Sequence, residues 1–172
     1  MTSERGMCAA LEAVYALAAN RMAVPPQKLL LWGKSLGTGP SVYMASEHRP
    51  MAGVVLVSPL ASGARCVCGE GVPRALLGVA DQLFMPSVER MPRVQVPVCV
   101  VHGTRDDVVA VENARALVAR CGARAAYPPL YVSAGHNDVE TLHGACFVAH
   151  VQRFLEHTAA VRAQPYVRDV DE

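Results

Sequence analysis

Four short runs of apolar residues, separated by longer segments with helical periodicity, limit the folds open to this chain more than any other feature. The runs occupy residues 28–32, 53–57, 96–101 and 129–132. Strands that are apolar along their whole length lie in parallel sheets that helices cover on both faces. We therefore expect an α/β fold whose mostly parallel sheet has about four strands. In such sheets the functional residues follow the carboxyl ends of the strands.

The segments between these runs predict the helices. Apolar residues repeat at helical spacing over 4–20, 36–47, 110–121 and 139–158. Residues 60–92 follow no clean period, and we interpret them as an irregular excursion with one helical piece near 74–84. The helix over 110–121 should end in a left-handed cap at Cys121-Gly122. We expect one domain over residues 1–158 and a polar, frayed tail over 159–172.

Composition and charge exclude several classes of protein. Hydrophobic residues make up 52% of the 172 residues and charged residues 18%, which excludes a disordered chain. A net charge of +1 gives no electrostatic reason to expect a nucleic-acid partner. No unbroken apolar run reaches the length of a membrane span. The six scattered cysteines are most simply buried free thiols in a reducing compartment, so we expect a cytoplasmic protein.

The first strand leads into a G-x-S-x-G pattern, Gly33-Lys34-Ser35-Leu36-Gly37, with a predicted helix after it. In that context the serine sits on a sharp turn above the sheet edge, and the glycines allow close backbone approach. The amide of Leu36 then points toward a developing oxyanion. The pattern alone fits an ordinary strand-to-helix turn equally well. A phosphate-binding loop would need a glycine where this chain has Lys28.

The third and fourth strands are each followed by a residue that would complete a serine-hydrolase set. Asp106 follows the third strand, where it could orient an imidazole or form an ordinary Asx-turn. His136 follows the fourth strand in a glycine turn, which suits a general base or a surface loop. The conjunction decides the interpretation, because Ser35, Asp106 and His136 follow strands in the chain order of α/β-hydrolases.

The remaining histidines have simpler interpretations. His102 lies at a strand end, and we interpret it as structural. His143, His150 and His157 lie seven residues apart on the last predicted helix, too far apart to share one metal ion comfortably. We interpret them as one solvated or half-buried helix face. The predicted chemistry therefore requires no metal and no cofactor.

Four segments of the chain resemble the α/β-hydrolase domain-containing depalmitoylases, serine hydrolases that remove S-palmitoyl groups from membrane-associated proteins. They are residues 31–40, 58–63, 102–106 and 135–138, in the family's order within residues 7–157. The resemblance implies that Ser35 is the nucleophile, Asp106 the acid and His136 the base. Asp107 is the second choice of acid, and Leu36 would supply an oxyanion-hole amide.

The resemblance also implies a reaction and a substrate. Ser35 would attack the carbonyl of an acyl thioester or ester, carried by an S-acylated protein or a lipid ester. A serine peptidase or esterase of the same fold is an alternative. We expect the protein in the cytoplasm, including the cytosolic face of membranes. The excursion would form an acyl-pocket wall or simply pack over the sheet, through Leu76, Leu77, Val79, Leu83, Phe84 and Met85.

The chain departs from the family pattern at its front. Complete members have several strands before the first helix seen here, and one of their loops supplies a second oxyanion-hole amide. We accordingly expect a partial α/β-hydrolase domain over 1–158, with an open first-strand edge through which the chain self-associates. The family's N-terminal cysteine cluster is absent, so the resemblance does not imply lipid anchoring. We still expect peripheral contact with a membrane. The alternative function is a truncated, inactive relative that acts as an interaction module.

Overall fold

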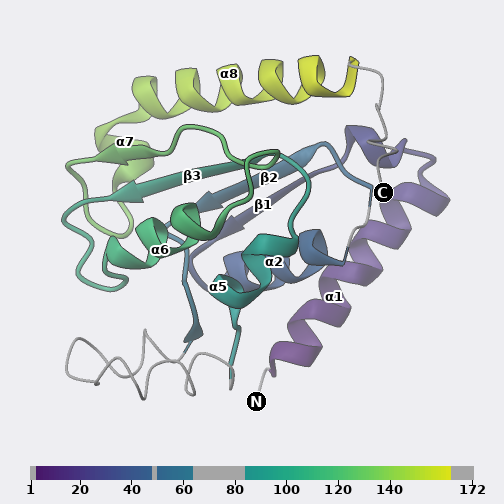
Figure 1. The fold of residues 1–172 in the computed structure, drawn as a ribbon, viewed down its shortest axis with the longest axis horizontal. Helices are drawn as coiled ribbons and strands as arrows, with labels where there is room; N and C mark the ends of the chain where they lie inside the picture. The colour runs from purple at the N-terminus through teal and green to yellow at the C-terminus, as the bar shows by residue number, and fades with distance from the viewer. Residues whose placement is uncertain (1–2, 48–49, 64–83, 164–172) are drawn as a thin grey trace, which may run out of the picture.

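The computed structural model describes residues 3–47, 50–63 and 84–163, which form a parallel sheet between two layers of helices (Figure 1). The strands are β1 (Leu30–Lys34), β2 (Gly53–Val57), β3 (Val98–Gly103) and β4 (Leu130–Val132), and the sheet order is β1-β2-β3-β4. Each neighbouring pair of these strands runs parallel. The predicted α/β fold with a parallel sheet is confirmed.

Helices cover both faces of the sheet. One layer holds α1 (Glu4–Ala16), α2 (Thr38–Ser46), α5 (Ser87–Arg90) and α6 (Glu112–Arg120). The other holds α7 (Val139–Leu142) and the long α8 (Gly144–Ala163), which Figure 1 shows running along the upper face of the sheet. Short helical turns complete the described chain: η1 (Leu17–Arg21), η2 (Pro26–Lys28), η3 (Ser35–Gly37) and η5 (Met91–Arg93).

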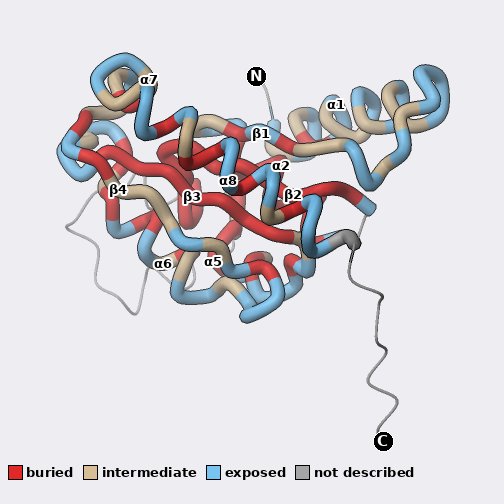
Figure 2. Tube along the Cα trace, turned by 90° about the horizontal axis from the view of Figure 1, so that it is seen from above, coloured by how far each residue is buried: buried red, intermediate tan, exposed pale blue. Residues whose placement is uncertain are grey.

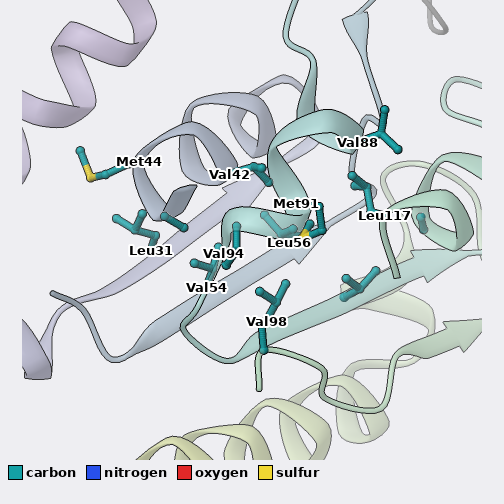
Figure 3. Close-up of a cluster of buried hydrophobic side chains, with 14 of the residues drawn as sticks. Leu31, Val42, Met44, Val54, Leu56, Val88, Met91, Val94, Val98 and Leu117 are labelled. Carbon is teal, nitrogen blue, oxygen red and sulfur yellow. The ribbon is translucent and has the colours of Figure 1, made fainter. Parts of the chain in front are cut away.

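Alternate residues of the central strands pack into two hydrophobic clusters, one on each face of the sheet. Val54 and Leu56 of β2 belong to the cluster beneath α2, α5 and α6, which Figure 3 shows with Leu117 of α6. Val55 and Val57 belong to the cluster beneath α8, together with Phe154. Because β2 and β3 are buried along their whole length, each contributes to both clusters. This double burial explains the unbroken apolar runs in the sequence.

Several element boundaries differ from the sequence prediction. The first strand was expected over 28–32, but η2 occupies Pro26–Lys28, where the Lys28 amide donates to the Pro25 carbonyl at 2.7 Å. Pairing with β2 therefore begins at Leu30 and continues to Lys34. The predicted left-handed cap at Cys121-Gly122 is wrong, because Cys121 is extended, with φ −72° and ψ 127°, and Gly122 does not adopt a left-handed φ.

The helix expected over 139–158 is divided in two. His143, with φ −124° and ψ 28°, separates α7 from α8. The longer helix α8 then continues to Ala163, past the predicted end. The first predicted helix, 4–20, is α-helical only to Ala16 and then continues as the π-helical turn η1. Local periodicity does not distinguish a continuous helix from two helices that share the same apolar pattern.

The thiols are free but differ in burial. Cys8 and Cys99 are buried, Cys121 is partly exposed and Cys146 is exposed, so the prediction of buried thiols is wrong for Cys146. Burial raises the pKa of Cys99 to about 12, which keeps this thiol protonated and unreactive at neutral pH. The remaining cysteines, Cys66 and Cys68, lie outside the described residues.

Strand β1 forms one edge of the sheet, and Figure 2 shows it at the margin of the molecule between α7 and α1. The Trp32 side chain in the middle of this strand is 49% exposed. Its ring meets the Phe147 ring of α8 edge-on, with centroids 5.8 Å apart. Within the described part of the chain, none of the helices is both long and apolar enough to cross a membrane.

Candidate active site

Ser35 stands on a strained turn between β1 and α2. It is the first residue of η3 and has a φ of 49°, a left-handed conformation that non-glycine residues rarely adopt. The Thr38 hydroxyl donates to the Ser35 carbonyl at 2.6 Å and so braces the turn. Such strain concentrates at functional sites, where the surrounding packing holds it in place. The predicted sharp strand-to-helix turn is therefore present.

The two glycines of the G-x-S-x-G pattern have different roles. A Cβ on Gly33 would lie 2.7 Å from the Gly37 carbonyl oxygen and 2.8 Å from Ser41 Oγ, so only glycine fits there. A Cβ on Gly37 would have nothing within 4 Å, and its φ of −65° suits any residue. The expectation that both glycines permit close backbone approach is therefore correct for Gly33 and wrong for Gly37.

Asp106 lies in a tight turn just after β3. Its Oδ1 accepts hydrogen bonds from the backbone amides of Val108 at 3.0 Å and Val109 at 2.7 Å. This is the Asx-turn that the sequence offered as the alternative to an acid. The two interpretations are compatible, because the turn occupies one carboxylate oxygen and leaves Oδ2 free to bind another group.

The turns after β3 and β4 are joined directly. The backbone amides of Thr104 and Arg105 donate to the carbonyls of Val132 and Ala134 at 2.7 and 3.0 Å. The guanidinium of Arg105 also donates to the Ser133 carbonyl at 2.8 Å. The segment that carries Asp106 is thus fixed against the segment that carries His136.

His136 links the serine to the carboxylate. Its Nδ1 lies 2.8 Å from Asp106 Oδ2, and its Nε2 lies 3.0 Å from Ser35 Oγ. Since a carboxylate only accepts, Nδ1 carries the proton and Nε2 accepts the hydroxyl proton of Ser35. The His136 side chain is 10% exposed and that of Asp106 is fully buried. The structure brings these three predicted residues together from three separate turns.

Hydrogen bonding keeps Asp106 ionised despite its burial. Burial alone would raise the pKa of this carboxyl group, but the Val109 amide, His136 and the Val108 amide together lower it below its ordinary value. Asp107, the second choice of acid, is exposed, and the interactions described for His136 involve Asp106 instead. An ionised, buried carboxylate at this position can hold an imidazole and stabilise its protonated form.

The other predicted site residues lie in different surroundings. The Leu36 amide is in the first turn of η3, where amides lack intrahelical partners, and the Leu36 side chain is 47% exposed. Met85 is fully buried against Gly39 of α2, which is the packing role rather than a pocket wall. Phe84 lines a depression beside α1, with Glu4 and Tyr43. Leu76, Leu77, Val79 and Leu83 lie outside the described residues.

A polar depression of about 530 Å³ adjoins His136. Its lining includes His136, Asp107 and Val108, and it is open to solvent along the turns after β3 and β4. A substrate group in this depression would be next to the imidazole. No described group of three or more His, Cys, Asp or Glu side chains has an arrangement that could hold a metal ion.

Of the three histidines expected on one helix face, His150 and His157 share a face of α8, whereas His143 does not. His143 precedes α8, and its Nε2 lies 3.2 Å from the Ser133 carbonyl oxygen. His150 is buried and His157 is partly exposed, and both rings contact the ring of Tyr127. Neither of these two histidines reaches the site.

One ion pair beside the site was not predicted from the sequence. Lys34, the residue before the serine, has its Nζ 2.9 Å from Oε1 of Glu140 in α7. The two residues are 106 positions apart in the chain, so no local pattern pairs them. Glu140 lies inside the predicted last helix and not at a strand end, so the sequence carries no signal that pairs it with Lys34.

Curated relatives identify the family. The α/β-hydrolase domain-containing protein aho-3 of Caenorhabditis elegans is 38% identical over 159 residues, which cover 92% of this chain and 45% of the relative. Human α/β-hydrolase domain-containing protein 17C is 34% identical over 155 residues, 90% of this chain and 44% of the relative. The chain belongs to this α/β-hydrolase family. No family model matches it.

Solved structures show the same fold. The esterase domain of a Rhodothermus marinus protein superposes on this α/β-hydrolase with a TM-score of 0.63 at 18% identity, covering 84% of this chain and 66% of that one. A Pyrococcus furiosus esterase gives a TM-score of 0.68 at 16% identity, covering 87% of this chain and 61% of that one. The α/β-hydrolase chain spans a little under half the length of its curated relatives, 45% and 44%.

Proposed function

We propose that this α/β-hydrolase chain carries the catalytic triad of a serine hydrolase that cleaves acyl thioester or ester bonds. One observation carries the proposal: a single imidazole, His136, lies within hydrogen-bonding distance of both the Ser35 hydroxyl and the Asp106 carboxylate. A serine next to a base that a buried carboxylate orients is the arrangement that activates a hydroxyl nucleophile. Two solved structures similar to this chain are named as esterases, which supports the same reaction class.

In the proposed reaction, Ser35 Oγ attacks the acyl carbonyl while its proton passes to His136 Nε2. Asp106 holds the Nδ1 proton and stabilises the imidazolium that forms. As the tetrahedral intermediate collapses, His136 returns the proton to the departing thiolate or alkoxide, and the acyl group stays on Ser35. Water then attacks the acyl-enzyme with His136 as its base, which releases the carboxylic acid and restores the serine.

The Leu36 amide is the proposed donor to the oxyanion. It follows the nucleophile directly and lies at the start of the helical turn η3, where amide groups point away from the helix body. Removing one such donor in other enzymes lowers the rate by roughly 10²–10³. The single amide accounts for part of the rate enhancement, and a second donor would add to it.

The proposed substrate is an acyl group of lipid character, carried as a thioester on a protein. Depalmitoylation follows from the resemblance to the depalmitoylases, and lipid esters are the runner-up. Two exposed apolar side chains beside the reactive groups support an acyl substrate, Leu36 next to Ser35 and Val108 next to His136. A membrane-associated substrate would bring the protein to the cytosolic face of a membrane by peripheral contact.

A serine-directed fluorophosphonate probe tests the proposal. The wild-type chain should become labelled, and Ser35→Ala should not. Ser133→Ala is the matched control, because Ser133 is an exposed serine at the end of β4 and alanine keeps the carbonyl that accepts from Arg105. If the wild-type protein is labelled, its rates of hydrolysis of a palmitoyl thioester and of an oxoester then distinguish depalmitoylation from lipid-ester hydrolysis. Equal labelling of wild type and Ser35→Ala would contradict the proposal.

An inactive interaction module is the second candidate, favoured by the exposed edge of the sheet. β1 pairs only with β2 in the described sheet, and Trp32 on that strand is half-exposed. An unpaired strand edge with an exposed aromatic residue can add a strand from another chain, including a second copy. Absence of labelling in a folded protein that dimerises, with dimers lost in Trp32→Lys, would support this candidate instead.

A further inference from the structure

A second histidine contacts the same carboxylate oxygen as His136. His102, in β3, has a fully buried side chain, and its Nε2 lies 3.3 Å from Asp106 Oδ2. The same nitrogen lies 2.8 Å from the carbonyl oxygen of Val109. Val109 in turn donates its amide to the other carboxylate oxygen, Oδ1, at 2.7 Å. His102, Asp106 and Val109 therefore form a closed set of polar contacts around the acid.

The partners of His102 fix where its proton lies. Both partners of Nε2 are acceptors, so Nε2 must carry a hydrogen and donate it. Nδ1 is buried and has no hydrogen-bond partner among the described residues, so a proton there would be unsatisfied. The ring is thus neutral with its proton on Nε2, donating to the Val109 carbonyl and leaning toward Asp106 Oδ2.

The electrostatic surroundings agree with a neutral ring. Burial lowers the pKa of His102, and it outweighs the Val109 carbonyl, Asp106 and Glu112, which raise it. His136 acts in the same direction as burial. A neutral His102 donates to the Asp106 anion and stabilises it. A cationic His102 would instead compete with His136 as the charged partner of Asp106.

We propose that His102 is a positioning residue for the acid of the triad, acting through Asp106 rather than on substrate. Its Nε2–H holds the Asp106–Val109 turn so that Oδ2 faces His136, and it donates a further partial hydrogen bond to that oxygen. This role replaces the purely structural interpretation of His102 from the sequence, and it rests on the proposed serine-hydrolase function. A histidine that only filled space in β3 would need no donor at Nε2.

Three substitutions of His102 separate the contribution of the Nε2 donor from that of the ring. His102→Gln can place its side-chain amide where Nε2 lies, and His102→Asn reaches only as far as Nδ1, so it is a folded polar variant without the donor. His102→Leu removes the donor altogether. His150→Leu is the matched control, because His150 is also buried but lies on α8 against Tyr127, away from the site.

The fluorophosphonate labelling rate, measured against pH, is the first readout. His102→Leu and His102→Asn should label about tenfold more slowly, the loss expected for one hydrogen bond to a charged group. Their loss of activity in acid should begin at higher pH, because Asp106 loses a donor that stabilises its charged form. His102→Gln should label at a rate within about twofold of the wild-type rate. His150→Leu should keep both the wild-type labelling rate and the wild-type pH at which labelling is lost in acid.

The second readout needs no substrate. The proton between His136 Nδ1 and Asp106 Oδ2 should give a low-field resonance in the proton NMR spectrum of wild type and of His102→Gln. In His102→Leu and His102→Asn this resonance should be displaced or lost. An unchanged resonance and pH limb in folded His102→Asn would overturn the positioning role. If wild type carries the resonance but never labels, the proposed hydrolase function fails while the resonance still decides the role of His102.

Discussion

Lys34 and Glu140 form a bidentate ion pair that joins the turn that carries Ser35 to the helix that follows His136. Lys34 Nζ lies 2.9 Å from Oε1 and 3.1 Å from Oε2 of Glu140. Lys34 directly precedes Ser35, and Glu140 stands in the first turn of α7, four residues after His136. The two segments lie far apart in the sequence, and this ion pair links them in addition to the Ser35–His136 hydrogen bond.

Breaking this ion pair should slow the fluorophosphonate labelling modestly. Partly exposed pairs contribute roughly 0–1 kcal/mol, so Lys34→Met or Glu140→Gln should lower the labelling rate by about two- to fivefold. The exchanged pair, Lys34→Glu with Glu140→Lys, should recover most of the loss. The labelling rate of wild type should also fall in high salt, whereas Lys34→Met should be insensitive to salt. A doubly exchanged protein as slow as either single variant would exclude this role.

Asp106 should be far more sensitive to substitution than Asp107. Asp106→Asn removes the charge that holds the Nδ1 proton of His136 and favours the wrong tautomer, so labelling should fall by roughly 10³–10⁴. Asp107→Asn changes an exposed neighbour and should label within about twofold of wild type. The measurement is the second-order rate of fluorophosphonate labelling, with circular dichroism to establish folding. Comparable losses in the two variants would contradict the assignment of the acid.

The stability of the protein should depend on the ionisation of Asp106 in acid. The folded-state pKa of Asp106 lies below the ordinary value of 3.8, so its contribution to stability is present above that value and is lost as the pH falls through the folded-state pKa. Asp106→Asn should be about 1–3 kcal/mol less stable than wild type at neutral pH. This difference in free energy of unfolding should narrow below pH 4, as urea titrations at several pH values would show. A difference that is constant or widens in acid would be inconsistent with the depressed pKa.

The two glycines of the nucleophile motif should respond in opposite directions to alanine. Gly33→Ala would push a methyl group into the Gly37 carbonyl and the start of α2, so it should destabilise the fold by roughly 1–3 kcal/mol. Gly37→Ala meets open space at a helical φ of −65°, so it should stabilise by about 0.4–1 kcal/mol. Urea unfolding of the two variants measures both. A destabilised Gly37→Ala or a neutral Gly33→Ala would show that the turn packs differently.

The turns that carry the three candidate residues could be predicted well because each follows an unbroken apolar strand. A parallel sheet brings the carboxyl ends of β1, β3 and β4 to one edge, so Ser35, Asp106 and His136 could be grouped without knowing any distance. The fold class follows from the same runs, since strands such as Gly53–Val57 can be buried on both faces only between two helical layers.

Contacts between segments distant in sequence could not be predicted in this way. The Lys34–Glu140 pair depends on where α7 starts, and the break at His143 that ends α7 leaves no gap in the apolar pattern. The contact of His102 with Asp106 spans only four residues, but it too was not predictable, because it depends on the curvature of the turn after β3 and on complete burial. The packing of Met85 under Gly39 likewise joins the excursion to α2 through tertiary contacts alone.

The most direct test is to map the site of fluorophosphonate modification by mass spectrometry in wild type and in His136→Ala. We predict a single adduct on the peptide that contains Ser35 in wild type, and its loss in folded His136→Ala, because the hydroxyl then has no base. An adduct on any other serine, or an equally labelled Ser35 without His136, would contradict the account.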